Sequence, residues 1–286
     1  MTFGLKVSQQ FATIDQLRRV WRAADDGGWD GCWIFDHLAP MGPVRSGDIF
    51  EAWTLLAAMA EATRRVRIGC IVSGNHYRHP ALLAKMAVTV DHLSGGRLDV
   101  GLGAGGDDHV DRRIGLPERS ARQRIAALAE SCQVLDAFWS DEVADVEGEH
   151  YRLTDAAALG HPKPVQRPRP PVWIGSSGER HGLRVVAEHA DGWFSAALPG
   201  AGPQEHARLS RVLDRHCADV GRDPAAIRRA VQFPLPATAE EAVAAVAEYR
   251  AAGFADVVFI VGGGGATAAD RVERAAELLP LLRQLD

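Results

Sequence analysis

Short apolar runs alternate with longer stretches of helical periodicity along most of this chain. Eight runs rich in β-branched and aromatic residues predict strands. They cover residues about 3–8, 31–35, 66–72, 97–102, 171–175, 191–195, 227–233 and 256–261. The stretches between them have apolar residues at helical spacing, and most follow a polar residue or a Pro or Gly that can begin a helix. They cover residues about 14–26, 51–63, 80–93, 119–139, 179–189, 203–220, 238–252 and 267–284.

This regular alternation predicts the fold class. Eight strands, each followed by a helix, favour parallel strands with right-handed crossovers that close into a (β/α)8 TIM barrel. A doubly wound open sheet is the alternative, although it does not need so regular an eighth unit. We therefore expect one α/β barrel domain over residues 1–286. Such a barrel binds its ligands at the carboxyl ends of its strands.

One segment, residues 141–170, interrupts the alternation before the fifth strand. It has a short β-like piece near residues 149–153, followed by a stretch rich in proline. That composition is too polar and too rich in Pro for another strand and helix, so we interpret it as an insertion. It is either a lid over the barrel mouth or a solvated excursion.

Composition narrows the class of partner. The chain is 47% hydrophobic and 24% charged, which is ordinary for a globular protein with a large core. A net charge of -5 gives no basic surface for nucleic acid, and we find no apolar run long enough for a membrane span or a secretory leader. The four cysteines are widely separated, which suits reduced thiols in the cytoplasm better than disulfides or a zinc site. We expect a small-molecule partner and a cytoplasmic location.

Polar residues and glycines gather where the predicted strands end. Asp36 and His37 follow the second strand, the segment 73–76 follows the third and the segment 103–105 follows the fourth. A histidine beside a carboxylate can transfer a proton or donate to a cofactor heteroatom. A capping pair in a loop is the alternative, because polar residues are common at the rim of any barrel.

Other motifs are weaker. Residues 101–106 fit GxGxxG, but a loop follows them instead of the helix that a dinucleotide site requires. There is no P-loop, and residues 175–178 read GSSG, not the GxSxG of a serine hydrolase. The histidines at 76 and 79 and the polar cluster at 107–111 lack a recognised metal-ligand spacing, so we predict no metal.

Several long blocks of sequence identify a family resemblance. They are WIFDHLAP at 33–40, EAWTLLAAMAEATRRVRIG at 51–69, YRHPALLAKMAVTVDHLSGGRLDVGLGAG at 77–105, PPVWIGSSGERHGLRVVAEHADGWF at 170–194 and HCADVGRDP at 216–224. In this order they resemble the luciferase-like flavin and deazaflavin oxidoreductases, and most closely the branch that uses coenzyme F420. The resemblance implies a TIM barrel with the cofactor across its carboxyl end.

The resemblance also implies roles for residues at the rim. Asp36 and His37 match a pair that lies near the hydride-carrying carbon and the ring edge of the cofactor in F420 relatives. The third strand ends in a bulge where the family often has a non-proline cis peptide behind the ring. The positions implied to bind the cofactor there and in the next turn are Cys70, Ile71, Val72, Ser73, Gly74, Asn75, Ala104, Gly105 and Gly106.

Two glycine-bearing turns compete as the phosphate site. The general barrel rule favours the turn after the eighth strand, residues 262–265. The resemblance instead implies the turn before the fifth helix, formed by Gly175, Ser176, Ser177 and Gly178. We follow the resemblance, although Ser176 stands where relatives commonly have a second glycine. Sugar-phosphate dehydrogenases of the family carry a glutamate where this chain has Gly106, which puts that substrate in doubt.

The expected activity is hydride transfer between F420 and a small organic substrate, with His37 as proton donor or acceptor and Asp36 orienting it or bonding the cofactor. Trp33, His109 and Trp193 are candidates for the substrate pocket, with ordinary barrel packing as the alternative for the two tryptophans. An FMN-dependent monooxygenase with a separate reductase and a non-catalytic flavin-binding protein are the other functions considered. Related barrels are often homodimers, so we expect a dimer.

Overall fold

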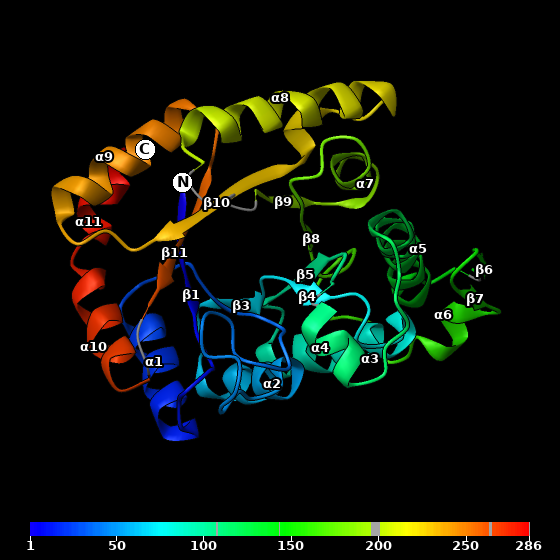
Figure 1. Cartoon of the computed structure of the whole chain (residues 1–286), viewed down its shortest axis with the longest axis horizontal. Helices are drawn as coiled ribbons and strands as arrows, with labels where there is room; N and C mark the ends of the chain where they lie inside the picture. The colour runs from blue at the N-terminus through cyan, green and yellow to red at the C-terminus, as the bar shows by residue number, and fades with distance from the viewer. Residues whose placement is uncertain (107, 143, 196–200, 263–264, 286) are drawn as a thin grey trace.

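The computed structural model describes residues 1–106, 108–142, 144–195, 201–262 and 265–285. Within them, eight parallel strands form a closed ring, and helices surround it (Figure 1). The ring runs β1 (Thr2–Val7), β2 (Gly31–Ile34), β3 (Arg67–Cys70), β5 (Leu98–Gly103), β8 (Val172–Gly175), β9 (Gly192–Ser195), β10 (Arg228–Pro234) and β11 (Asp256–Val261). It closes where β11 pairs with β1, with Thr2 opposite Asp256. The predicted TIM barrel is therefore confirmed.

The third strand is divided. After β3, a two-residue strand β4 (Ser73–Gly74) continues the pairing with β5, so that Gly74 lies opposite Gly103. The peptide bond between Ile71 and Val72, which separates β3 from β4, is cis. The resemblance implies a cis peptide at this bulge, and the structure confirms it.

Aromatic rings fill the interior of the barrel. The ring of Trp33 lies over Gly4 and Gly31, where any side chain on either glycine would collide with it. Trp173 and Phe194 stack with ring centroids 4.7 Å apart in the same interior cluster. Because side chains fill this space, the barrel is a packed core and not a pore, and a ligand can bind only at its rim.

Helices cover the outside of the ring. They are α1 (Ile14–Asp26), α2 (Ala52–Ala62), α3 (Pro80–Ser94), α4 (Asp108–Arg113), α5 (Ala121–Trp139), α7 (Gly182–His189), α8 (Pro203–Asp219), α9 (Ala239–Ala251), α10 (Gly265–Ala276) and α11 (Leu279–Leu282), with single 3-10 turns η1 (Pro224–Ala226) and η2 (Arg283–Leu285). Thr13, Ser120 and Thr238 begin α1, α5 and α9 with capping boxes. These satisfy amide groups that a helix start leaves without partners.

Three predictions about helices need correction. The sequence predicts a loop after residue 106, but the short helix α4 forms at Asp108–Arg113. The sequence predicts one helix over 267–284, but α10 ends at Ala276 and α11 begins at Leu279. Pro280 has no amide hydrogen and fits only the first turn of a helix, so the chain restarts there. The helix expected from residue 179 begins at Gly182, after the GSSG turn.

The predicted insertion before the fifth strand is present. It contains a hairpin of β6 (Val146–Glu147) and β7 (Arg152–Leu153) and a short helix α6 (Ala156–Leu159) that was not predicted. Figure 1 shows this group beyond α5, at the outer edge of the molecule. Glu130 on α5 accepts backbone hydrogen bonds from residues 149–151, at 2.7 to 3.0 Å, and so anchors the hairpin turn.

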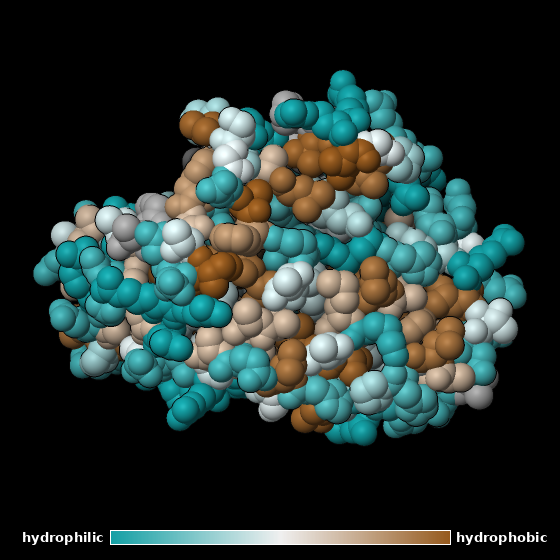
Figure 2. Space-filling view, turned by 90° about the horizontal axis from the view of Figure 1, so that it is seen from below, coloured by the Kyte–Doolittle hydropathy of each residue, from teal (hydrophilic) through white to brown (hydrophobic). Residues whose placement is uncertain are grey.

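On the face shown in Figure 2, hydrophobic side chains lie in several groups separated by hydrophilic ones. In the described part of the chain, no helix combines the length and the hydropathy needed to cross a membrane.

Candidate functional site

The end of β2 places Asp36 and His37 at the carboxyl rim. Asp36 is buried, at 2% exposure, whereas His37 is half-buried with its ring edge-on to Phe35 at a centroid distance of 5.8 Å. The Asp36 carboxylate accepts a hydrogen bond from the backbone amide of Gly74 at 3.2 Å. The pair thus belongs to the same rim as the segment that follows the cis peptide.

An arginine that sequence reasoning missed holds Asp36. Arg78 donates to both carboxylate oxygens, at 2.5 and 3.1 Å, and its Nη2 also reaches Glu51 at 3.0 Å. Burial alone would lower the pKa of Arg78, but the hydrogen bonds and charge of Asp36 outweigh it and raise that pKa. Arg78 therefore stays charged and fixes the Asp36 carboxylate, so Asp36 has less freedom to act on His37 than the sequence suggested.

Side chains of the segment 70–75 lie on two sides, some toward the helices and some toward the barrel interior. Cys70 packs in the core that faces the helices, and the Ser73 hydroxyl accepts from the indole of Trp53 at 2.9 Å. Ile71 and Val72 instead join the cluster inside the barrel. Thus Ile71 and Val72 lie where a ligand at the rim could touch them, whereas Cys70 and Ser73 support this segment from behind.

Val72 brings three neighbouring strands together. A Cβ placed on Gly103 would lie 2.5 Å from the side chain of Val72, and one placed on Gly175 would lie 2.9 Å from it. Glycine is required at both positions because Val72 fills the space that a side chain would need. The turns after β5 and β8 therefore bring bare backbone to the same part of the rim, where a flat ligand can approach closely.

The turn after β5 is shaped by Gly105 and Gly106, with φ of 72° and 110°. Both values lie in the left-handed region that glycine adopts without strain. Gly105 lies against the ring of His76, and a Cβ on Gly106 would be 2.7 Å from Cζ of Arg124. The backbone amide of Asn75 donates to the carbonyl of Gly103 at 3.0 Å and so joins this turn to the end of β4. Ala104 is half-buried beside it.

The GSSG turn leads into α7. The Ser176 hydroxyl accepts from the amide of Gly178 at 3.3 Å, and the indole of Trp193 donates to the Ser176 carbonyl at 2.8 Å. No side-chain cap hydrogen bond is made by the N-cap residue of α7, His181, within the described residues. Ser177 is half-buried and Gly178 exposed. The turn is thus held in place from below while amides at the start of α7 have no capping side chain.

The three predicted pocket residues lie in different environments. Trp33 is inside the barrel, below the rim, and Trp193 is fully buried among the residues that face the helices, with Phe254 6.0 Å from it. Both placements favour ordinary packing over a pocket wall. The side chain of His109 lies outside the described residues, as do positions 263 and 264 of the glycine run.

Sequence reasoning also missed a lysine inside the barrel. Gly4 faces the interior ring of Trp33, so Lys6, two residues further along β1, faces inward near the carboxyl end. Its Nζ lies 3.3 Å from the amide oxygen of Gln232 and 5.5 Å from the ring centroid of Phe35. Burial lowers the pKa of Lys6. A lysine at an inward position of an apolar strand was the signal that could have identified it.

Fold and rim together define a parallel α/β barrel whose carboxyl end brings polar groups and bare glycine backbone to one place. The sequence model of the luciferase-like monooxygenase family matches residues 1–284. The chain therefore belongs to the luciferase-like monooxygenase family.

Relatives in this family include F420 enzymes. The chain is 31% identical over 242 residues to the F420-dependent glucose-6-phosphate dehydrogenase of Segniliparus rotundus, covering 81% of this chain and 68% of that protein. It is 32% identical over 192 residues to the protein of the same name from Amycolatopsis mediterranei, covering 65% and 54%. The matched segments thus span between about half and about two thirds of these relatives' own length.

Solved structures show the same fold. An F420-dependent secondary alcohol dehydrogenase, determined with an F420-acetone adduct, superimposes with a TM-score of 0.84 at 17% identity and covers 99% of both chains. The F420-dependent tetrahydromethanopterin reductase of Methanopyrus kandleri superimposes with a TM-score of 0.79 at 17% identity, covering 98% and 99%. At this identity the likeness concerns the fold.

Proposed function

We propose that this protein is an F420-dependent oxidoreductase that transfers a hydride between the deazaflavin and a small organic substrate. The observation that carries the proposal is the 31% identity, over 242 residues, to an F420-dependent glucose-6-phosphate dehydrogenase. The fold it shares with an F420-dependent alcohol dehydrogenase and reductase supports it. The sugar-phosphate substrate is not part of the proposal, because the family resemblance implies an acid for that substrate where this chain has Gly106.

The residues at the rim fit a deazaflavin. Val72 and the bare backbone at Gly103 and Gly175 offer a surface for a flat ring, and Asn75 is 4% exposed with no partner for its Oδ1 among the described residues. The amides at the start of α7, beside Ser176, suit the phosphate of the cofactor. When bound, F420 supplies hydride chemistry, while the protein supplies position and electrostatics.

Within this proposal each polar group has a role. His37 holds or moves the proton that accompanies hydride transfer, since an imidazole nitrogen can donate or accept a proton. Asp36, fixed by Arg78, keeps the end of β2 and the segment after the cis peptide in register. Lys6 provides a positive charge below the ring site. A homodimer and a cytoplasmic location belong to the same proposal.

Cofactor titration tests the proposal directly. The purified apoprotein is titrated with F420 and, separately, with FMN, and the absorbance change of each chromophore is followed. We expect saturable binding of F420 and at least tenfold weaker binding of FMN. Preference for FMN, with oxygen consumption when a reductase is added, would instead indicate the FMN-dependent monooxygenase.

Replacing His37 separates an enzyme from a flavin-binding protein. His37→Ala should lower the rate of hydride transfer by about 10²- to 10⁴-fold, the usual contribution of a general acid or base, while F420 still binds. His161→Ala, at an exposed histidine of the insertion, is the matched control and should leave the rate unchanged. Cofactor binding without any substrate turnover in either protein would favour the non-catalytic alternative.

A further inference from the structure

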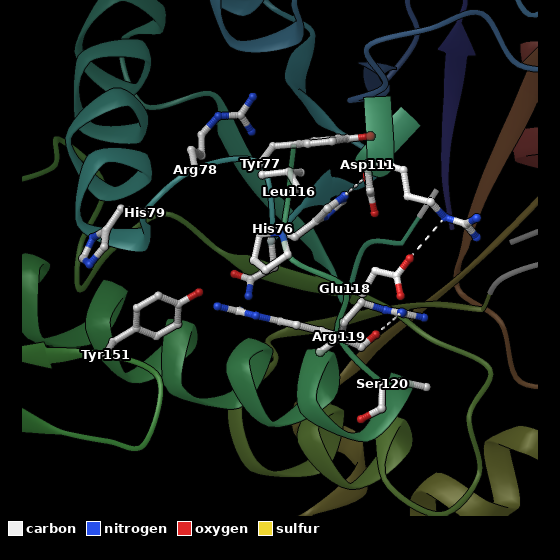
Figure 3. A pocket seen from close by; sticks show the side chains of 15 residues that line it. His76, Tyr77, Arg78, His79, Asp111, Leu116, Glu118, Arg119, Ser120 and Tyr151 are labelled. Atoms are coloured by element: carbon white, nitrogen blue, oxygen red, sulfur yellow. Dashed lines mark hydrogen bonds and ion pairs between the residues drawn. The ribbon is translucent and has the colours of Figure 1, made fainter. Parts of the chain in front are cut away.

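A cavity of about 710 Å³ lies beside the rim, outside the predicted cofactor site except for Asn75. Its walls come from residues 75–79 before α3, from residues 111–124 around α4 and the start of α5, and from Tyr151 of the insertion. Figure 3 shows Glu118, Arg119 and Ser120 on one side of it, with His79 and Tyr151 on the other. This volume is in the range of small-molecule binding sites.

Four arginines line this cavity, and two of them have a carboxylate partner. Arg78 pairs with Asp36 and Glu51, and Arg112 pairs with Glu118 at 3.3 Å. The second carboxylate in the wall, Asp111, is 3.0 Å from His76, as the dashed line in Figure 3 marks. Both acidic groups of the wall are therefore already engaged.

The other two arginines, Arg119 and Arg124, have no carboxylate partner within the described residues. Nη1 of Arg124 donates to the backbone carbonyl of Arg119 at 2.7 Å, and its Nε is buried without a hydrogen-bond partner. Arg119 is half-buried, and the described residues provide no hydrogen bond or ion pair for its guanidinium. A buried donor without a partner costs free energy, so a ligand that supplies an acceptor here is favoured.

The guanidinium of Arg124 also connects the cavity to the rim. It lies against Gly106, in the turn that the family resemblance implies to bind the cofactor. A planar guanidinium such as that of Arg119 can bind both oxygens of a carboxylate through paired hydrogen bonds. Tyr151 and His79, with ring centroids 5.3 Å apart, offer aromatic surface opposite.

The geometry points to a site for a carboxylate in the part of this wall that holds Arg119 and Arg124, beside the rim, with the guanidinium of Arg119 as its main donor. We assign this carboxylate to an acidic substrate held next to the deazaflavin. This assignment of substrate class rests on the proposed function. The acidic side chain of F420 itself is the other source of the same chemistry, and the experiment below distinguishes the two.

The test is isothermal titration calorimetry of the protein with and without bound F420, using glutarate as the probe and the uncharged glutaramide as its matched partner. We expect glutarate to bind and glutaramide to bind at least tenfold more weakly. Arg119→Gln should weaken glutarate binding about tenfold or more, the usual loss for a charged hydrogen bond. Arg122→Gln, an exposed position on the first turn of α5 outside the cavity wall, removes the same charge and should have no effect.

Glutarate binding to the F420-loaded protein shows whether the carboxylate comes from a substrate or from the cofactor. Glutarate binding that persists with F420 bound supports an acidic substrate. The site belongs to the cofactor if glutarate and F420 compete for it. In that case Arg119→Gln should weaken binding of full-length F420 but not binding of an F420 fragment that lacks the acidic side chain. Equal affinity for glutarate and glutaramide, or an unchanged affinity in Arg119→Gln, overturns the carboxylate site. Failure of F420 to bind while glutarate binds would instead contradict the proposed function and leave this site intact.

Discussion

At the amino ends of the barrel strands, Asp99 and Asp256 each bind an arginine, whereas near the carboxyl ends several cations have no carboxylate partner among the residues that the structure describes. Arg67 donates to Asp99 through Nε and Nη2, at 2.6 to 3.2 Å, and Arg228 pairs with Asp256. These pairs join neighbouring strands of the ring where it is packed and closed.

The carboxyl end is organised differently. Among the described residues, Lys6 contacts the side-chain amide oxygen of Gln232 and the ring face of Phe35 but pairs with no carboxylate, and neither Arg119 nor Arg124 has a carboxylate partner. Paired charges occur at this end too, since Arg78 binds both oxygens of Asp36 and Arg112 pairs with Glu118.

The difference separates stability from function. Removing one member of a buried ion pair leaves the other charge uncompensated and destabilises the folded state, while a half-buried charge without a partner costs free energy until a ligand of opposite sign arrives. Because both kinds occur in one barrel, substitutions at the two ends should have opposite effects on unfolding and on binding.

The largest effect is expected from breaking the amino-end pair. Asp99→Ala removes the carboxylate that pairs with Arg67 and should lower the free energy of unfolding by about 3 kcal/mol, as for other buried pairs that lose one member. Urea denaturation measures this loss, and F420 affinity of the folded protein should stay the same.

The matched control uses a surface pair. Asp15→Ala breaks the exposed ion pair to Arg18, 3.3 Å long, and should change the free energy of unfolding by less than about 0.5 kcal/mol. Similar effects of the two substitutions, or loss of F420 affinity in Asp99→Ala, would contradict the division between the two ends.

A smaller effect with the opposite pattern is expected at Lys6. Lys6→Met keeps the apolar stem and removes a charge without a carboxylate partner, so the free energy of unfolding should stay constant or rise by about 1 kcal/mol. Affinity for F420, an anion, should fall about tenfold, and the difference from the unaltered protein should shrink at high salt. A clear loss of stability together with unchanged F420 affinity would show that Lys6 serves the fold alone.

The same comparison shows what the sequence could predict. Alternation of apolar runs and helical stretches determined the barrel, because that pattern is local and repeats along the chain. It did not determine which side of a strand faces inward. Trp193 and Phe194 are adjacent aromatics in β9, and only the structure shows that Phe194 faces the interior while Trp193 faces the helices.

Contacts between side chains that are distant in the sequence could not be predicted either. Nothing local signals that Arg78, 42 positions further along the chain, binds Asp36. The glycines at 103 and 175 could be recognised as rim residues, but their shared neighbour Val72 could not. The backbone positions of the candidate site were therefore predictable, whereas the charges that complete it depend on contacts between distant segments.

The smallest expected effect is a pH dependence at the carboxyl end of β9. The ring of His206, on α8, lies 2.7 Å from the Ser195 hydroxyl, packs against Tyr249 and Phe254, and is 1% exposed. Burial lowers the pKa of His206 below the ordinary value of 6.5, although the charge of Glu205 opposes the shift. The unfolded chain therefore takes up the proton at a higher pH than the folded protein does.

The sign of the effect follows from this difference. Above the unfolded value His206 is neutral in both states and its contribution to stability is complete. As the pH falls below that value the unfolded state binds more protons, so the free energy of unfolding decreases until the folded histidine is also protonated. Urea denaturation from about pH 8 to about pH 5 measures the slope. His206→Asn, which keeps a polar group near Ser195, should have a flatter slope in this range, and identical slopes in the two proteins would show that His206 does not titrate differently on folding.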